Sequence, residues 1–329
     1  MKSRPFSQFA SIALGTAAGA LLGFLVGRNA KKPAVRTQEA PCPPGTFEWG
    51  ETAETDAFFD RHPGFFPAFE RIVVLSNKCF ARPLPKPYYG PEYTLFSLGD
   101  ACRQEYMEIL FLAAHGYGTA ASKLLRGFYE RAVALAYMLR NRDKIKRFRN
   151  FAAVQEHKAM KDALKATTEE QWVTVMGEDY APAEVTKRFE EVRAEFQQTD
   201  CKKCGTKRPS ISWDIDVASM VAKVGEPYTT YYLMAYTNAN LQIHATAASA
   251  LRVNEKGQAR RLIDQRAEAD VALFSASILL TEVFRHQNTL MSLSLDDEIQ
   301  DCENAIARVW KDAIDARTGR PGGDARRSE

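Results

Sequence analysis

The N-terminal part of this chain constrains its architecture more than any other segment. Residues 9–27 read FASIALGTAAGALLGFLVG and contain no charged side chain. A helix of these nineteen residues rises about 28 Å, which matches the hydrocarbon core of a bilayer. Because every backbone polar group must be bonded within the segment in lipid, the run predicts one membrane-spanning helix.

The alternative is a cleaved signal peptide. Its apolar core would be about 7–15 residues long and would end at a cleavage site of small residues. Here the run is longer, and Arg28 stands where a small residue is needed before Ala30. We therefore expect a retained anchor behind a basic segment at residues 1–8. More basic residues follow the span than precede it, which favours a C-terminal body in the cytoplasm.

Glycine recurs at every fourth position of the predicted span. Small residues at this spacing form a groove that lets two helices approach closely. Glycine is also common in membrane helices in general, so composition is an alternative explanation. The pattern favours a homodimer through the GxxxG repeat of Gly15, Gly19, Gly23 and Gly27.

The charge of the chain is unevenly distributed. Residues 1–38 carry six basic and no acidic side chains, whereas the whole chain has a formal net charge of +3, so the remainder is mildly acidic. Such a body lacks the clustered Lys and Arg on which nonspecific nucleic-acid binding depends. The basic N-terminal region instead suits a lipid bilayer as partner.

Beyond the predicted span the pattern is helical. Residues 28–92 are rich in Pro and Gly and predict a linker with one short helix at 70–79. From Tyr93 onwards apolar residues recur at helical spacing, without alternating strands and without an internal repeat. We expect an all-α fold, with a single N-terminal transmembrane helix, a multi-helix bundle over 93–316 and a disordered tail at 317–329. Helices are expected at about 93–114, 117–140, 143–165, 168–176, 181–199, 214–223, 227–252, 258–292 and 296–315.

The helix SKLLRGFYERAVALAYMLRN is apolar over most of its circumference, which is typical of a buried helix. Arg126 and Glu130 nevertheless lie one turn apart on it, and Tyr137 falls near the same face. A buried pair of this kind can be an internal clasp that fixes the helix register. It can also form part of a wall that binds an anionic or polar ligand.

A second polar row contains Tyr232, Tyr236, Asn240 and His244 at successive four-residue steps. A single histidine on an apolar helix face is more often a bonded core residue than a catalyst. Histidine titrates near neutrality, however, so this row becomes an acid–base site if it meets the other polar face. The catalytic candidates for such a hydrolase or nuclease are Arg126, Glu130 and His244. By contrast, His157 is expected on a solvated, charged helix. The highly charged segment 181–199 is also expected to be solvated.

Cys201 and Cys204 form a CxxC pair within a Lys- and Gly-rich loop. This is half of a zinc knuckle, because a structural zinc ion needs four ligands and the chain has no second pair. Zinc would therefore require dispersed ligands or a second subunit. The two remaining possibilities are a zinc-stabilised dimeric scaffold and a surface loop with two thiols. The chain contains no phosphate-binding, dinucleotide-binding or metalloprotease signature, so no other cofactor is expected.

Three segments together resemble one bacterial family. They are LLRGFYERAVALAYMLRN, the pair Ser212–Trp213 after a Lys/Arg loop, and YTNANLQIHA. The family is a domain of unknown function, DUF5677, and the resemblance covers roughly residues 93–292. It implies an all-helical domain without an established activity. The family's characteristic polar residues match Arg126, Glu130, Trp213 and His244.

These observations favour a membrane-anchored interaction or sensor module, in a bacterial stress or defence setting. The anchor, the linker, the acidic body and the missing catalytic signatures all agree with it. The candidates for lining a ligand pocket are Tyr137, Trp213, Tyr236 and Asn240. The hydrolase or nuclease and the zinc-stabilised scaffold are the alternatives.

Overall fold

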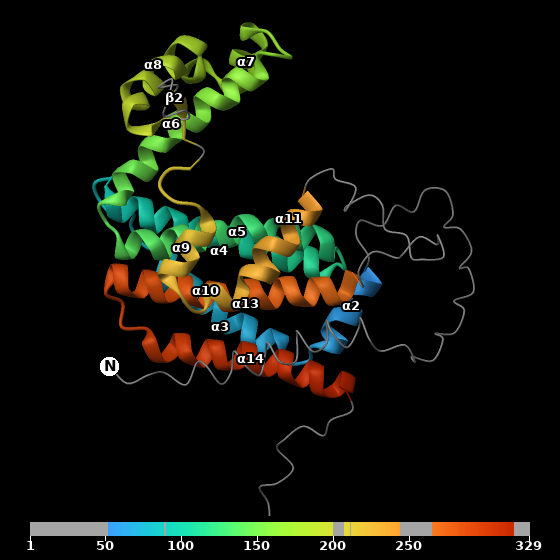
Figure 1. Ribbon diagram of the computed structural model, residues 1–329. Coiled ribbons are helices and arrows are strands. Elements are labelled where there is room, and N and C mark those ends of the chain that lie inside the picture. The colour runs from blue at the N-terminus through green and yellow to red at the C-terminus, as the bar shows by residue number, and fades with distance from the viewer. Residues whose placement is uncertain (1–51, 89, 200–206, 211, 244–264, 319–329) are drawn as a thin grey trace, which may run out of the picture. The chain divides into compact units, whose positions relative to one another are not determined.

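The computed structural model describes the helical body of the chain (Figure 1). No helix in this part of the protein is both long and apolar enough to cross a membrane. The described residues are 52–88, 90–199, 207–210, 212–243 and 265–318.

Several of the predicted features lie outside the described residues. They are the basic segment at 1–8, the membrane span at 9–27 with its four glycines, most of the tail, and the candidate residues Cys201, Cys204 and His244. These features remain predictions from the sequence.

The predicted all-α class is confirmed for the described residues. Two 3-10 turns, η1 (Glu178–Tyr180) and η2 (Arg193–Phe196), interrupt the helices. The helices are α2 (Thr52–Arg61), α3 (Phe65–Phe80), α4 (Pro91–Ala114), α5 (Gly118–Arg140), α6 (Lys144–Ala163), α7 (Glu169–Met176), α8 (Pro182–Val192), α9 (Val217–Val224), α10 (Tyr228–Tyr231), the π-helix η3 (Tyr232–Thr237), α11 (Asn238–Ile243), α13 (Gln265–Met291) and α14 (Asp296–Thr318).

One short hairpin departs from the predicted pattern. The strands β1 (Gln197–Thr199) and β2 (Lys207–Pro209) pair antiparallel, with Gln198 opposite Arg208. Three-residue strands are too short to show an alternating pattern, which explains why sequence periodicity missed them. The CxxC segment lies between the two strands in the sequence.

The chain divides into two compact units. Unit 1 combines Met1–Pro83, Leu98–Val133 and Gly225–Glu329, and unit 2 combines Leu84–Ser97 with Ala134–Val224. Helices α4 and α5 therefore contribute residues to both units. The single bundle predicted over residues 93–316 therefore corresponds to neither unit.

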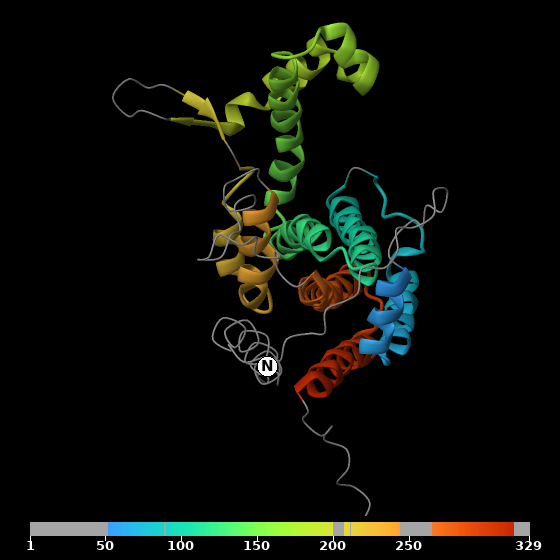
Figure 2. The ribbon, with the colours of Figure 1, turned by 90° about the vertical axis from the view of Figure 1, so that its right-hand side faces the viewer.

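Helix α13 occupies the interior of unit 1. Figure 2 shows it end-on among the other helices of the unit. Its apolar residues Leu273, Leu280 and Phe284 have no exposed surface, and polar residues such as Ser275 and Gln287 are equally buried. A helix that is buried around most of its circumference shows only a weak amphipathic pattern, so α13 depends on partners on several sides.

Helices α2 and α3 differ from the linker expected over residues 28–92. Helix α3 is sixteen residues long and buries Phe65, Ile72 and Leu75 at helical spacing. It packs against α13 and α14. Pro67 lies in its first turn, where a missing backbone N–H costs little, so this proline begins a helix instead of interrupting one.

Unit 2 is built around the packing of α6 against α8. The charged segment 181–199 was expected to be solvated, but Val185 and Phe189 of α8 are buried. His157 was also expected on a solvated face. It is instead 9% exposed, and its ring stacks on that of Phe189 at a centroid distance of 4.0 Å. Both corrections have one cause, because two amphipathic helices bury the faces that they turn toward each other.

A close backbone approach at the start of α5 yields a first prediction. A Cβ atom added at Gly118 would lie 2.1 Å from the carbonyl oxygen of Gln265 and 2.7 Å from the nitrogen of Ala269. Backbone atoms cannot move aside as a flexible side chain does. Gly118→Ala should therefore lower the free energy of unfolding by about 1–3 kcal/mol, the usual cost of overpacking.

Urea denaturation followed by circular dichroism measures this difference. Gly64→Ala is the matched control, because its added Cβ would meet only Val309, at 3.5 Å. Equal unfolding midpoints for the two variants would contradict the predicted close contact between α5 and α13.

Candidate functional site

Arg126 and Glu130 form an ion pair on α5. The Nε atom of Arg126 donates to Oε1 of Glu130 at 3.1 Å. The side chains are 24% and 37% exposed, so the expectation of a buried pair is corrected: this pair lies at the surface of unit 1. The reason is that α5 buries its apolar row, including Leu125, Phe128 and Tyr129, and leaves the polar row outside.

A tyrosine from a distant segment completes the surroundings of Arg126. The guanidinium carbon lies 5.3 Å from the ring centroid of Tyr236, within the range of a cation–π contact. Tyr232 stacks on Tyr236 at 5.3 Å, and both rings approach that of Tyr129. The row that contains Tyr236 therefore meets the row that contains Arg126 at these two residues.

The tyrosines Tyr232 and Tyr236 belong to the π-helix η3. The backbone hydrogen bonds of a π-helix join residues five apart, whereas those of an α-helix join residues four apart. The side chains of Tyr232 and Tyr236 therefore do not follow the α-helical spacing on which the predicted row was based. Segments of π-helix cost stability and are frequent at functional sites. This local irregularity is the strongest structural indication that the Arg126 surface has a function.

The arginine side chain keeps hydrogen-bonding capacity. Within the part of the chain that the structure describes, neither Nη nitrogen of Arg126 has a hydrogen-bond partner. The carboxylate of Glu130 and the ring of Tyr236 hold the guanidinium from two sides. An oriented guanidinium with free nitrogens suits the two-point recognition of a carboxylate or phosphate group.

The wall behind this surface is rigid. Tyr129 is fully buried, and its hydroxyl donates to the backbone oxygen of Tyr228 at 2.6 Å. Burial raises the pKa of the Tyr129 hydroxyl far above its ordinary value. The hydroxyl of Tyr228 in turn contacts Nε2 of His286 at 2.9 Å. These groups hold α5 and α10 together and keep the nearby rings in place.

A second ion pair, which was not among the predicted candidates, links α4 to α5. Arg131 donates a short hydrogen bond to Glu105. The other carboxylate oxygen of Glu105 is buried without a hydrogen-bond partner. Burial raises the pKa of Glu105, and the opposing effect of Arg131 offsets this only in part. Glu105 and Arg131 lie on two different helices, so the spacing of charges along the sequence does not reveal that they pair.

Two of the predicted pocket residues belong to unit 2. The Tyr137 hydroxyl donates to Oδ2 of Asp214 at 2.8 Å, and burial raises the pKa of this hydroxyl to about 12. Trp213 packs edge-on against Tyr137 and Phe148. The structure therefore assigns the predicted set to two places, with Tyr137 and Trp213 in one unit and Arg126, Glu130, Tyr236 and Asn240 in the other.

The remaining candidates are not brought to a site by the described residues. Asn240 is partly exposed on α11. Among the residues that the structure describes, no three His, Cys, Asp or Glu side chains are grouped to hold a metal ion. The roles of His244, Cys201 and Cys204 stay predictions.

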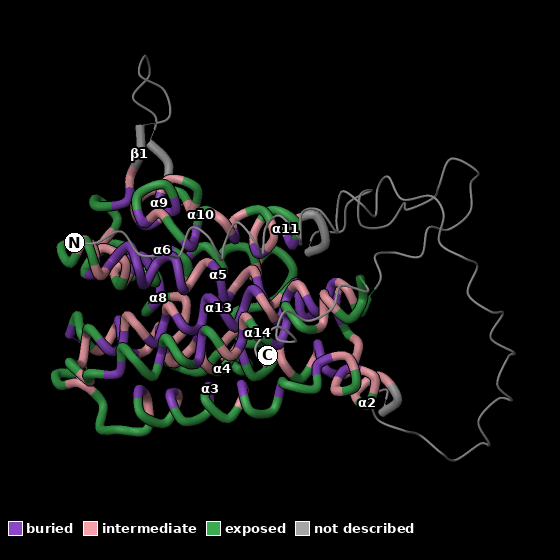
Figure 3. The backbone as a smooth tube through the Cα atoms, turned by 90° about the horizontal axis from the view of Figure 1, so that it is seen from below, coloured by how far each residue is buried: buried purple, intermediate pink, exposed green. Residues whose placement is uncertain are grey.

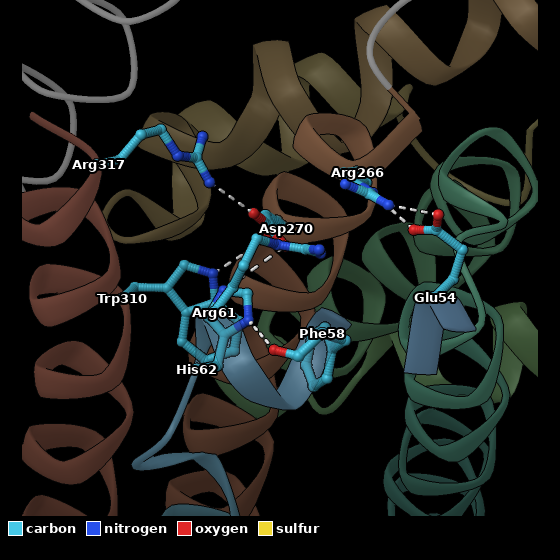
Figure 4. Close-up of polar contacts among 8 residues, drawn as sticks. All are labelled: Glu54, Phe58, Arg61, His62, Arg266, Asp270, Trp310 and Arg317. Atoms are coloured by element: carbon cyan, nitrogen blue, oxygen red, sulfur yellow. Dashed lines mark hydrogen bonds and ion pairs between the residues drawn. The ribbon is translucent and has the colours of Figure 1, made fainter. Parts of the chain in front are cut away.

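A buried charged cluster in unit 1 was missed altogether (Figure 4). Asp270 of α13 is 7% exposed, and its Oδ2 accepts a hydrogen bond from Arg317 at 3.0 Å. Its Oδ1 lies 3.8 Å from Nη2 of Arg61 and 3.6 Å from Nε2 of His62. Its backbone oxygen accepts a hydrogen bond from the Trp310 indole. One carboxylate thus joins α2, α13 and α14.

The protonation state of His62 follows from its contacts. Nδ1 lies 2.9 Å from the backbone oxygen of Phe58, which can only accept, so Nδ1 carries a proton. Burial lowers the pKa of His62, although the neighbouring Asp270 opposes the shift. The neutral ring therefore turns an unprotonated Nε2 toward Asp270. Both facing atoms are buried without a hydrogen-bond partner.

A nearby ion pair supports the same end of α13. Arg266 donates two hydrogen bonds to Glu54 of α2, at 2.6 and 2.5 Å (Figure 4). Glu54, Arg61 and His62 lie in the segment expected to be a linker, and neither Asp270 nor Arg317 was among the candidate residues. Pairing across more than 200 residues leaves no trace in local spacing.

The family model of a family of unknown function, DUF5677, matches residues 93–260. The chain belongs to this family. The match is shorter than the resemblance expected over 93–292. No curated protein and no solved structure matches the chain.

The DUF5677 match includes the Arg126 surface but not the Asp270 cluster. It contains Arg126, Glu130 and Tyr236, whereas His62 and Asp270 lie outside it. The Arg126 surface is therefore the candidate site of the DUF5677 segment. The Asp270 cluster belongs to the flanking helices that complete unit 1.

The buried neutral His62 predicts that stability depends on pH. In the unfolded chain His62 has a pKa near 6.5, and in the folded chain its pKa is lower. As the pH falls below about 6.5, the unfolded state binds more protons, so stability is lost at up to about 1.4 kcal/mol per pH unit. Above that pH this contribution is constant.

Urea denaturation at a series of pH values between 7.5 and 5 tests the assignment. His62→Gln should show a smaller loss than the parent on acidification. His157→Gln is measured beside it, because burial also lowers the pKa of His157. If His62→Gln loses stability as steeply as the parent, then His62 is not a neutral buried residue in the folded protein.

Proposed function

We propose that this DUF5677 protein is a membrane-tethered helical module that binds a small ligand with an anionic group and a planar part at the Arg126 surface. Such binding suits a sensor or interaction role. One observation carries the proposal: Arg126 is held between Glu130 and Tyr236, while no described residue occupies its Nη nitrogens. The guanidinium would bind the anionic group, and the stacked rings of Tyr232 and Tyr236 would contact the planar part.

The arrangement favours binding over hydrolysis. Arg126 and Glu130 already contact each other, and the tyrosines beside them provide apolar surface. The alternative hydrolase or nuclease requires His244 as an additional acid or base, and no contact within the described residues supports that role. In the proposed module, Glu130 positions Arg126 and accepts a hydrogen bond from the ligand.

Binding of phenyl phosphate tests the proposed site, because this probe combines a phosphate group with an aromatic ring. The full chain in detergent micelles should unfold at a higher temperature in its presence, as expected for a ligand that binds only the folded state. Arg126→Gln should abolish the shift. Arg126→Lys should weaken it, because a lysine keeps the charge but loses the planar fork.

Two further variants make the test specific. Tyr236→Leu should remove the advantage of phenyl phosphate over inorganic phosphate. Arg103→Gln is the matched control, because Arg103 is also paired with an acid, Asp100, and lies over the ring of Phe80. Equal shifts for the parent and Arg126→Gln, or a loss in Arg103→Gln alone, would reject the Arg126 site.

The tether is supported by the uncharged run at residues 9–27, with the lipid bilayer as partner and the body in the cytoplasm. The glycines of the run support a homodimer within the membrane. The full chain should stay in the membrane fraction after extraction with alkaline carbonate. The double variant Leu14→Arg and Leu21→Arg should be released, because arginine at the centre of a span costs about 2.5–3.5 kcal/mol.

The control for this prediction is Leu14→Ile and Leu21→Ile, which keeps the run apolar and should stay in the membrane fraction. Release of the parent chain by carbonate would contradict the anchor. It would leave the Arg126 site unaffected, since that site is tested by ligand binding.

A further inference from the structure

Helix α2 is attached to unit 1 by few buried groups. Of its residues from Glu54 to Arg61 only Phe58 is buried, and Figure 3 shows intermediate and exposed residues over the rest of the helix. The ring of Phe58 packs edge-on against that of Phe65 in α3. Helix α13 holds α2 through the Glu54–Arg266 ion pair and the cluster around Asp270. The attachment of this helix therefore depends strongly on charged groups.

Buried polar atoms without a hydrogen-bond partner gather at this attachment. Within the part of the chain that the structure describes, such atoms include Oγ1 of Thr55, Nε and Nη1 of Arg61, Nε2 of His62 and Oδ1 of Asp270. A buried polar atom that lacks a hydrogen bond disfavours the packed position, because the same atom is hydrogen-bonded when water surrounds it. An element held in this way belongs to the least stable part of a domain, which opens locally before the rest unfolds.

A proton on His62 would weaken the attachment further. The charged groups that act on its ring are Arg61 of α2, Asp270 of α13 and Arg317 of α14. Nδ1 already carries the proton that points to the backbone oxygen of Phe58, so a second proton goes to Nε2. Protonation then raises the net charge of the cluster from +1 to +2, around a ring that is 1% exposed. Additional charge in a buried place disfavours the packed position of α2.

We propose that α2 is a proton-operated latch, which leaves unit 1 when His62 takes up a proton at Nε2 while α3, α13 and α14 stay folded. Burial lowers the pKa of His62 in unit 1, whereas the ring of the released helix lies in water with its ordinary pKa near 6.5. Release therefore becomes more favourable as the pH falls below about 6.5. It adds the ten residues of α2 to the segment between the predicted span and the body.

Hydrogen exchange of the full chain in detergent micelles tests the latch, because this method reports the opening of each helix separately. A helix of ten residues is not stable on its own, so its amides lose protection on release. The protection of residues 55–61, corrected for the intrinsic exchange rate, should fall by up to about tenfold per pH unit between about pH 6.5 and 5. At every pH it should be at least about tenfold lower than that of residues 273–284 in α13.

Two variants assign the proton. His62→Gln should remove the fall in α2 protection, because glutamine stays neutral over this pH range. His157→Gln is the matched control: burial also lowers the pKa of His157, but this residue belongs to unit 2. The control should keep the fall of the parent chain. The comparison of α2 with α13 in the parent needs no variant, so it decides the proposal even if His62→Gln does not fold.

Three results would reject the latch. Equal protection of α2 and α13 at each pH would mean that α2 leaves only when the whole unit unfolds. Equal α2 protection at pH 7.5 and 5 would mean that no proton operates it. An unchanged fall in His62→Gln would assign the proton to another group. None of these results bears on phenyl phosphate binding at Arg126, so the two proposals fail or succeed separately.

Discussion

Unit 1 depends on the burial of α13 and on the partners that its polar residues require. Asp270 is bonded by Arg317 and lies beside Arg61, the Ser277 hydroxyl contacts that of Tyr106, and Asn288 accepts a hydrogen bond from the backbone of Leu295 just before α14. A buried polar group without a partner costs several kcal/mol at most positions. Helices α2, α4 and α14 are therefore held in place by hydrogen bonds as well as by apolar packing.

This dependence explains the extent of the domain. The DUF5677 match ends at residue 260, before α13 begins, yet the apolar residues of α5 up to Val133 share unit 1 with α13 and α14. The flanking helices complete the core of the family segment. In the Asp270 cluster, one carboxylate lies among two guanidinium groups and a neutral histidine and joins α2 to α13 and α14. Because the histidine is His62, the contribution of this cluster to stability depends on pH.

The Arg126 surface differs in character from the apolar core behind it. It is polar and aromatic, and its shape depends on a π-helix that places Tyr232 and Tyr236 together beside α5. Such a surface suits a small ligand that combines a charged group with a planar part.

The sequence alone determined the helical class, the approximate bounds of α4, α5, α6 and α7, and the pairing of Arg126 with Glu130 one turn apart. These features depend on contacts within a few residues along one helix, which periodicity records. Only the tertiary structure decided that the pair is partly exposed, that Tyr236 covers it while Tyr137 bonds to Asp214, and that α2 and α3 are packed helices. It also decided that His62 and Asp270 meet, because groups about 200 residues apart are joined by packing, and local sequence pattern carries no information about such a pairing.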